Sequence, residues 1–455
     1  MQNAQVLDFL YDTNWSDLPV DIQRLAQTCV FDLLGVAAGS LATAASRMIR
    51  DHAVAHFAPG HDAPASRLLF DGRPASPVGA ALAGALSIDS LDGHDGYRPA
   101  KGHVGVAVLP AILAIADSEK TALDGRSFLN LIVLGYELAS RMAVAQHSTT
   151  SDYHASGSWN GVACAALAAR LLELDQGRAR EAMGIAEYHG PRSQMMRCIA
   201  HPTMVKDSSG WGAMTGVSAA YLAQAGFSGA PSLIVEAADS QFAWRDLGSR
   251  WLIAEQDFKP YPVCRWAHAA IAAVEGLQQR HAIKPETIER IEIFTFHQGC
   301  CLNHPRPSTT EQAQYSLPFP VAAMLAKGKV GALEVTSGLD DPDILRLADR
   351  VEMIDSAEYN ACFPAQRLAR ATITLSDGAR YESDTTPAIG SPETPLSGAE
   401  LEGKFHDLAD PVLGSDHAHA VKLCLEALPQ ADSLQPLLET ILIAPGNIKI
   451  ASSAA

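Results

Sequence analysis

The sequence has little positive charge for its size. Its 455 residues include 34 Lys and Arg against 51 Asp and Glu, which gives a formal net charge of −17. Unspecific nucleic-acid binding needs a basic surface, so this balance argues against that class of function. An anionic small molecule remains compatible with it, because one pocket can be positive within an acidic protein.

Signals for export and for membrane insertion are also missing. The first residues, MQNAQVLDFLYD, contain no basic stretch followed by an apolar core, so we predict no signal peptide. No run of about eighteen apolar residues is free of charges, so we predict no membrane span. Both absences favour a cytoplasmic protein without a membrane partner.

The eight cysteines are scattered and form no C-x-x-C pair. Disulfides are rare in the cytoplasm, so we expect buried free thiols. The adjacent Cys300 and Cys301 suggest a metal or cluster site, but no second motif with zinc-type spacing accompanies them. We therefore predict neither a metal nor a cofactor.

The first part of the chain shows the apolar spacing of helices. In residues 19–40, Leu25, Cys29, Leu33 and Val36 follow one another at steps of three and four. Ser76-Pro77 provides an N-cap and a first-turn proline for a helix over residues 76–91. Further helices are predicted over 106–118 and 127–146, from Ala163 onwards, and over 211–225. With 47% hydrophobic residues, the chain can bury a large helical core.

The pattern changes after about residue 285. Residues 288–296, IERIEIFTF, alternate apolar and polar positions and predict a half-buried strand, as do residues 369–375. Asp377-Gly378 after the second run predicts a hairpin. Helices are predicted over 343–352 and 397–408. The fold class is therefore mainly α, with an all-helical domain (residues 1–269 and 396–455) and a smaller α+β lid domain (residues 270–395).

Ionisable side chains crowd into a few Gly- and Pro-broken segments between apolar helices. The segment at 92–103 reads DGHDGYRPAKGH, and similar segments contain His154, Lys206 and the run from Lys259 to His268. Such groups are costly in a cleft unless they pair or bind something. A solvated surface is the simplest alternative for any one of them. A metal held by Asp92, His94, Asp95 and His103 is another, although their spacing is irregular.

Several motifs resemble the MmgE/PrpD family, which includes 2-methylcitrate dehydratase, cis-aconitate decarboxylase and iminodisuccinate epimerase. They are FDLLGVAAG from Phe31, ASPVGAALAGAL from Ala75, FKPYPVCRWAH from Phe258 and AQYSLPFPVAAML from Ala313. The resemblance covers nearly the whole chain. It implies a large helical domain, a smaller α+β lid and a homodimer.

The resemblance also implies site residues. The family's acidic run falls on residues 92–96, where Asp92 and Asp95 match, while His94 replaces an aspartate and Gly96 a threonine. The implied catalytic residues are Asp92, His103, His154, Lys206 and Lys259. The residues assigned to substrate binding are His94, Asp95, Arg98, Lys101, Arg192, Arg197, Arg265, His268 and Tyr315.

Members of this family share a metal-free step at a carbon next to a carboxylate. Lysines and arginines can stabilise the negative charge that develops there, and a histidine or aspartate can take the proton. The altered acidic run, together with Arg98 and Lys101, favours an epimerase of the iminodisuccinate epimerase type acting on a small polycarboxylate. A dehydratase of the 2-methylcitrate type, a decarboxylase of the cis-aconitate type and a scaffold that binds polycarboxylates without turnover are the alternatives.

Overall fold

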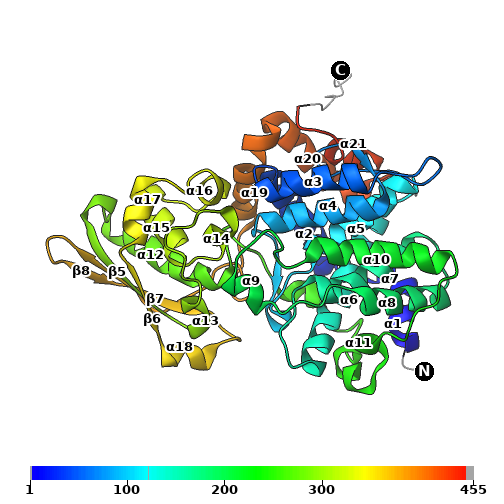
Figure 1. Cartoon of the computed structure of the whole chain (residues 1–455), viewed down its shortest axis with the longest axis horizontal. Helices are drawn as coiled ribbons and strands as arrows, with labels where there is room; N and C mark the ends of the chain where they lie inside the picture. The colour runs from blue at the N-terminus through cyan, green and yellow to red at the C-terminus, as the bar shows by residue number, and fades with distance from the viewer. Residues whose placement is uncertain (1–2, 121, 447–455) are drawn as a thin grey trace.

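The structure is a computed structural model that describes residues 3–120 and 122–446. A large body of helices carries the N-terminus, and a smaller part with a sheet extends from one side of it (Figure 1). This arrangement confirms the predicted mainly α fold class with a smaller α+β part.

The body is built from the N-terminal helices. Their bounds are α1 Asn3–Asp12, α2 Val20–Ser40, α3 Ala44–His56, α4 Pro77–Ser90, α5 Gly105–Ser118, α6 Gly125–Thr149, α7 Gly157–Leu171, α8 Gln176–His189, α9 Met196–Ala200, α10 Ser209–Gln224 and α11 Leu233–Glu236. The predicted N-cap of α4 is confirmed, because the Ser76 side chain accepts a hydrogen bond from the Gly79 amide. Small residues let α7 and α10 approach closely: a Cβ on Gly212 would lie 2.5 Å from the carbonyl oxygen of Gly157.

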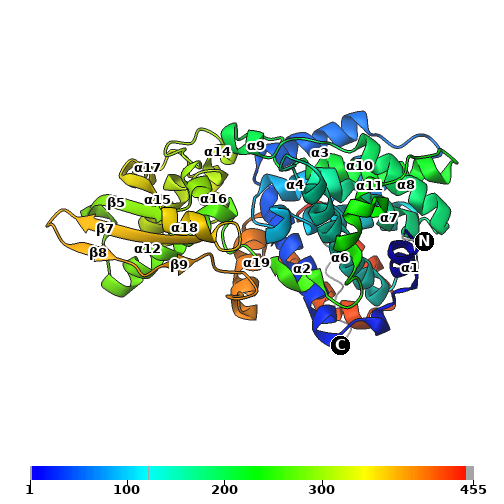
Figure 2. The same cartoon turned by 90° about the horizontal axis from the view of Figure 1, so that it is seen from below.

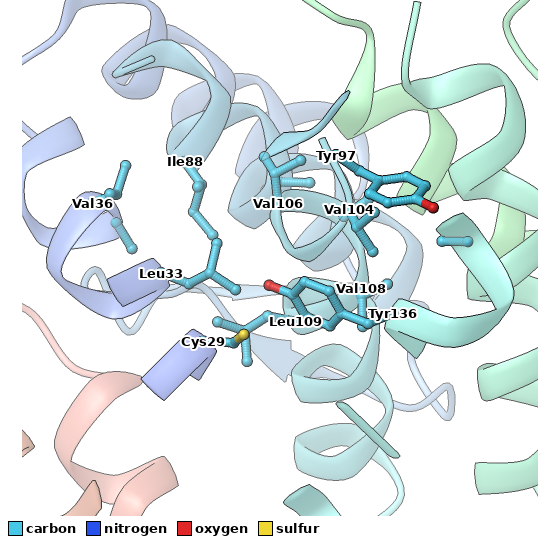
Figure 3. Close-up of a cluster of buried hydrophobic side chains, with 14 of the residues drawn as sticks. Cys29, Leu33, Val36, Ile88, Tyr97, Val104, Val106, Val108, Leu109 and Tyr136 are labelled. Atoms are coloured by element: carbon cyan, nitrogen blue, oxygen red, sulfur yellow. The ribbon is translucent and has the colours of Figure 1, made fainter. Parts of the chain in front are cut away.

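Helices α2, α4, α5 and α6 meet in a continuous apolar core. Figure 3 shows side chains from α2, α4, α5 and α6 pointing into one cluster, among them Cys29, Leu33, Ile88, Leu109 and Tyr136. These side chains are almost completely removed from solvent. The site described below lies at the edge of this rigid cluster.

Helix α6 is long and apolar enough to cross a bilayer by length and composition alone. In the protein, 94% of its apolar window is buried against other parts of the chain. Helices α2 and α3 pass the same test only as a pair, and they are bent by 91° at the break between them. The burial of α6 in the core accounts for its apolar composition.

The smaller part contains α12 His268–His281, β5 Ile288–Thr295, α13 His297–Cys300, α14 Thr310–Gln314, α15 Pro318–Lys327, α16 Ala332–Thr336, α17 Pro342–Ala348, β6 Val351–Asp355, α18 Ala357–Cys362, β7 Leu368–Leu375, β8 Arg380–Glu382 and β9 Thr386–Pro387. The strands run in the order β6-β5-β7-β8, and β9 pairs with β7. The predicted hairpin is confirmed, since β7 and β8 are antiparallel neighbours around Asp377-Gly378. Helix α12 contacts β7, and α15 contacts both α12 and β6 (Figure 2).

One predicted helix is partly wrong. Residues 343–352 were expected to be helical, but α17 ends at Ala348 and Val351 begins β6, which pairs in parallel with β5. Because Val351, Met353 and Ile354 of β6 are only half buried at the sheet edge, the segment lacks the strong alternation that marks β5.

The C-terminal helices α19 Gly398–Leu413, α20 Ser415–Ala427 and α21 Gln435–Ile441 return to the body. Helix α19 packs on α2, where the Phe405 and Phe31 rings stack with centroids 4.4 Å apart. Lys404 of α19 donates to Asp32 of α2 at 2.6 Å and to the carbonyl oxygen of Gly93 at 2.7 Å. Helix α19 thereby contacts the loop that begins the site.

Two short sheets join distant loops. Strands β1 Ser66–Arg67 and β2 Pro74–Ala75 form one, and β3 Gly96–Tyr97 pairs antiparallel with β4 Gln256–Asp257 to form the other. The second pairing holds the 92–103 segment against the segment that contains Lys259.

We expected all eight cysteines to be buried free thiols, and four of them are buried. Cys300, Cys362 and Cys424 are half-buried, and Cys301 is exposed. The expectation of buried thiols is therefore wrong for the adjacent pair, because it lies on the outer face of the smaller part, at the end of α13.

Candidate active site

A cavity lies between the body and the smaller part, and several predicted residues line it. Its lining includes Asp92, Arg98, Lys101, His103, Lys259, Arg265 and Tyr315 from the predicted set. Tyr153, Asp257 and Arg367 also line it, with apolar walls from Met195, Ile199 and Trp266. The cavity volume is about 50 Å³, which is enough for a few water molecules.

Local contacts fix the backbone of the 92–103 segment. The Asp95 carboxylate accepts hydrogen bonds from the amides of Val104 and Gly105 at the start of α5, and from the Tyr136 hydroxyl. Burial raises the pKa of Asp95 to about 6. Asp95 is thus a support beneath the site, and its side chain does not reach the cavity.

Lys259 and Asp92 form a buried ion pair at one wall of the cavity. The Lys259 ammonium donates to an Asp92 carboxylate oxygen at 2.9 Å and to the Asp92 carbonyl oxygen at 3.0 Å. Burial favours the protonated form of Asp92, but the charges of Lys259 and Lys206 outweigh burial and hold its pKa well below the usual range. Asp92 is therefore an anion held by lysine.

His103 lines the cavity and is held from both ends. Its Nδ1 lies 2.5 Å from the carbonyl oxygen of Asp95, and its Nε2 lies 3.3 Å from Oδ2 of Asp207. Burial, with the nearby charge of Lys259, lowers the pKa of His103 to about 4. The ring is therefore a neutral imidazole near pH 7, which is the form that can accept a proton.

His94 lies directly behind His103 instead of in the cavity. The two rings meet edge to face with centroids 4.4 Å apart, and Nε2 of His94 is 3.5 Å from Oδ1 of Asp89. Burial and the charge of Lys259 lower the pKa of His94 to about 3. His94 supports the His103 ring and does not contact the cavity.

Lys206 is buried beside the cavity, behind Tyr315. Its ammonium donates to Oε1 of Gln314 at 2.7 Å and lies 4.6 Å from the centre of the Tyr315 ring. Burial lowers the pKa of Lys206, but the carboxylates of Asp92 and Asp89 outweigh burial, so its pKa is raised and it is a cation. Lys206 and Ser208 both have positive φ angles, of 46° and 56°. Such backbone is costly for these residues and is often found at functional sites.

Three arginines surround one aspartate at the other wall. Asp257 of β4 lies 3.4 Å from Arg265, 3.4 Å from Arg367 and 3.6 Å from Arg98. Arg98 also binds Glu393 with two hydrogen bonds, of 2.6 and 2.9 Å. Asp257 and Glu393 together provide two carboxylates for three guanidinium groups, so this wall keeps a surplus of positive charge.

The cavity as a whole is cationic. Five positive side chains line it, namely Arg98, Lys101, Lys259, Arg265 and Arg367, against the two negative side chains Asp92 and Asp257. The site thus has the local positive charge that an anionic small molecule needs, although the chain as a whole is acidic.

Three predicted site residues lie away from the cavity. The side chain of Tyr153 lines the cavity. Neighbouring side chains in an extended segment point to opposite sides, so the His154 side chain points away from the cavity. Its Nδ1 lies 2.7 Å from the carbonyl oxygen of Asp152. Arg197 is exposed on α9, whereas Ile199 of the same helix and Met195 just before it line the cavity. Arg192 is exposed and pairs with Glu187 at 3.4 Å.

His268 also differs from its predicted role. It is fully buried, with Nε2 3.0 Å from the Val263 carbonyl oxygen and Nδ1 3.2 Å from the Arg265 guanidinium. It therefore orients Arg265 from behind and does not contact a ligand directly.

Sequence reasoning missed Tyr153, Asp207, Asp257 and Arg367. Asp207 directly follows Lys206, and Asp257 precedes Lys259 by two positions. Their closeness to predicted catalytic lysines could have identified both aspartates as site residues. Arg367 begins the β7 segment far from the other site residues, and only the fold brings it to the cavity.

Metal ligation was the alternative for the 92–103 segment. Among residues 3–120 and 122–446, no group of three or more His, Cys, Asp and Glu side chains is placed to hold a metal ion. The Asp92 carboxylate is instead bound to Lys259, and the Asp95 carboxylate to the start of α5.

Comparison with protein-family models gives two matches. The model of the MmgE/PrpD N-terminal domain matches residues 4–249, and the model of the MmgE/PrpD C-terminal domain matches residues 261–430. Together they span nearly all of the chain. No curated protein matches the sequence.

Proposed function

Because this chain belongs to the MmgE/PrpD family of small-acid dehydratase- and epimerase-type enzymes, we propose that it removes a proton next to a carboxylate of a small polycarboxylate. Within that chemistry we propose an epimerase of the iminodisuccinate epimerase type. The observation that carries the proposal is one neutral histidine, His103, in a cavity lined by five cations and two aspartates.

The cations match a substrate with more than one carboxylate. The guanidinium groups of Arg265 and Arg367 can bind one carboxylate through paired hydrogen bonds. Lys259 lies on the Asp92 side of the cavity, and its ammonium, which donates two hydrogen bonds to Asp92, has one N–H left for a second carboxylate. A substrate with two or more carboxylates would use both walls, whereas a monocarboxylate would leave one wall unpaired.

His103 takes the proton in this mechanism. Removal of a proton next to a carboxylate leaves negative charge that spreads onto that carboxylate, and nearby cations lower the barrier by stabilising this charge. Lys259 contacts the cavity directly, and Lys206 adds positive charge from behind Tyr315. Epimerisation also needs a donor on the other face of the carbon, and the Lys259 ammonium is the proposed donor.

Proton exchange tests the proposal. The protein is incubated in D2O with iminodisuccinate, 2-methylcitrate and cis-aconitate separately, and each reaction is followed by NMR. We expect deuterium to enter iminodisuccinate at the carbon next to a carboxylate, with interconversion of its stereoisomers. Loss of water from 2-methylcitrate would identify a dehydratase, and loss of carbon dioxide from cis-aconitate a decarboxylase. A variant with Gln at His103 serves as the inactive control.

The same assay tests the absence of a metal from the proposed mechanism. We expect the exchange rate to survive exhaustive treatment with EDTA, because the proposed steps use only His103 and the cationic side chains. Loss of exchange that a divalent ion restores would overturn this part of the proposal.

A further inference from the structure

Both ring nitrogens of His103 face an acceptor oxygen. The carbonyl oxygen of Asp95, 2.5 Å from Nδ1, can only accept, so Nδ1 carries a hydrogen. Nε2 faces the Asp207 carboxylate at 3.3 Å. This contact is within ion-pair distance, so a proton on Nε2 would place the positive charge of the imidazolium next to the Asp207 carboxylate. The second nitrogen of His103 is therefore coupled to Asp207.

Asp207 is placed to respond to the charge of His103. It is 1% exposed, and its carboxylate accepts hydrogen bonds from the Ser156 hydroxyl at 3.2 Å and the Tyr315 hydroxyl at 3.4 Å. In the part of the chain that the structure describes, no lysine or arginine nitrogen lies within ion-pair distance of this carboxylate, and His103 is its ion-pair partner. Asp92 differs, because Lys259 already binds it.

We propose that Asp207 is the positioning residue that makes His103 a base, because its carboxylate stabilises the positive charge of the ring once Nε2 of His103 has accepted the substrate proton. This inference rests on the proposed function and assigns a role to a residue that does not line the cavity. In the forward step the C–H bond of the substrate breaks, its electron pair remains on the substrate, and the proton binds Nε2. The imidazolium that forms is then neutralised by the Asp207 carboxylate.

The surroundings of the pair set the direction of its pH dependence. Six charged or titratable side chains from five segments surround the pair. They are Asp89 of α4, Asp92 and His94 of the 92–103 segment, Lys206 before α10, Lys259 after β4 and Tyr315 after α14. Burial lowers the pKa of His103, while Asp207 acts to raise it. Burial raises the pKa of Asp207 to about 6. The pair loses its proton as pH rises through this range, so its capacity to accept the substrate proton increases with pH there.

An asparagine at position 207 keeps the shape of the side chain and removes its charge. Without that charge, the pKa of His103 falls further and the base becomes weaker. We expect Asp207→Asn to lower kcat on the order of a hundredfold or more, as loss of acid–base catalysis does, with little change in KM. Asp117→Asn, which removes an aspartate paired with Arg67 away from the site, is the matched control and should leave kcat unchanged.

A measurement without substrate separates this inference from the proposed function. Histidine labelled with 15N is incorporated into the full-length protein, and the ring signals are followed against pH, with His103 assigned by loss of its signals in His103→Gln. We expect the midpoint of His103 to move to lower pH in Asp207→Asn. An unchanged midpoint overturns the inference, even if the epimerase assignment is correct. A shifted midpoint supports it, even if no substrate in the panel reacts.

The wild-type protein provides a second test if the asparagine variant does not fold. The contact with Asp95 requires the neutral ring of His103 to carry its hydrogen on Nδ1. The 15N shifts distinguish this tautomer from the other one. A neutral His103 with its hydrogen on Nε2 overturns the inference, and a hydrogen on Nδ1 supports it.

Discussion

Lys259 is buried at a position where an unpaired charge would be very costly. It is 1% exposed, and its ammonium is bound by Asp92. A buried ion pair contributes little net stability, but removal of one partner costs about 3–5 kcal/mol because the other charge stays buried. Stability and catalysis are therefore both sensitive to this lysine, and an experiment must separate the two.

We predict that Lys259→Met lowers both the unfolding free energy and turnover. Methionine keeps the length of the side chain and removes the charge that stabilises the developing carbanion, so turnover should fall on the order of a hundredfold or more. The double variant Lys259→Met/Asp92→Asn removes both charges. It should recover much of the stability in urea unfolding without recovering turnover. Recovery of turnover along with stability would show that Lys259 is only structural.

Arg367 could not be identified as a site residue from the sequence, and it provides a second prediction for a single residue. Its guanidinium lines the cavity and faces Asp257. A hydrogen bond between arginine and a substrate carboxylate is charge-assisted and therefore strong. We therefore expect Arg367→Gln to raise KM for a polycarboxylate about tenfold or more, with a smaller change in kcat. Arg370→Gln is the matched control three residues further along the chain, on β7, where Arg370 packs over Phe294 and does not line the cavity. Equal KM values for both variants would contradict the assignment of Arg367 to substrate binding.

Site residues that are close together along the chain could be predicted from the sequence. The 92–103 segment and the 258–268 run carry most of the lining, and their charged groups interrupt apolar sequence in a way that is visible without a structure. The orientation of a side chain was not accessible in the same way. His154 and Tyr153 are neighbours, yet only Tyr153 faces the cavity, because the direction of an extended segment depends on its partner, here Gln194.

At the scale of elements, helices and strands with a strong apolar periodicity could be predicted from the sequence, and those with a weak periodicity could not. Helices α2, α4, α5, α6, α7 and α10 and strands β5 and β7 were predicted from the sequence, and their apolar positions are mostly buried. The edge strand β6 is half exposed and follows α17 after two residues, so only its pairing with β5 defines it. The β3–β4 pairing has two residues on each side and could not be predicted from any pattern, although it holds the site together.

The start of α5 gives the prediction at this scale. Gly105 lies where a Cβ would meet the Tyr136 hydroxyl at 2.1 Å and the Asp95 carboxylate at 2.5 Å. We predict that Gly105→Ala lowers the unfolding free energy by about 1–3 kcal/mol through overpacking. It should also lower turnover, because Asp95 positions His103. Gly276→Ala is the matched control inside α12, where no atom lies within 4 Å of the added Cβ. It should raise stability slightly by its helix propensity, and urea unfolding of both variants checks the pair.

At the scale of the whole molecule, the α8–α10 region of the body exposes large apolar side chains. The side chains of Tyr188 in α8, Met196 in α9, Val205 in the loop before α10 and Trp211 in α10 are between 41% and 77% exposed. Exposed apolar side chains on neighbouring elements are typical of surfaces that bind another protein. Val205 and Trp211 flank the buried Lys206, so a partner bound to this region would lie next to a segment of the site.

We predict that this region joins two copies of the chain, which is the homodimer expected from the family resemblance. Sedimentation at micromolar concentration should give twice the chain mass of 48.3 kDa. Trp211→Glu places a charge in this region and should shift the protein towards the monomer, because burial of an unpaired charge is costly. Leu333→Glu on α16 is the matched control, since Leu333 is 52% exposed on the smaller part. A wild-type monomer, or equal dissociation of both variants, would show that the exposed apolar side chains of α8–α10 are not a dimer contact.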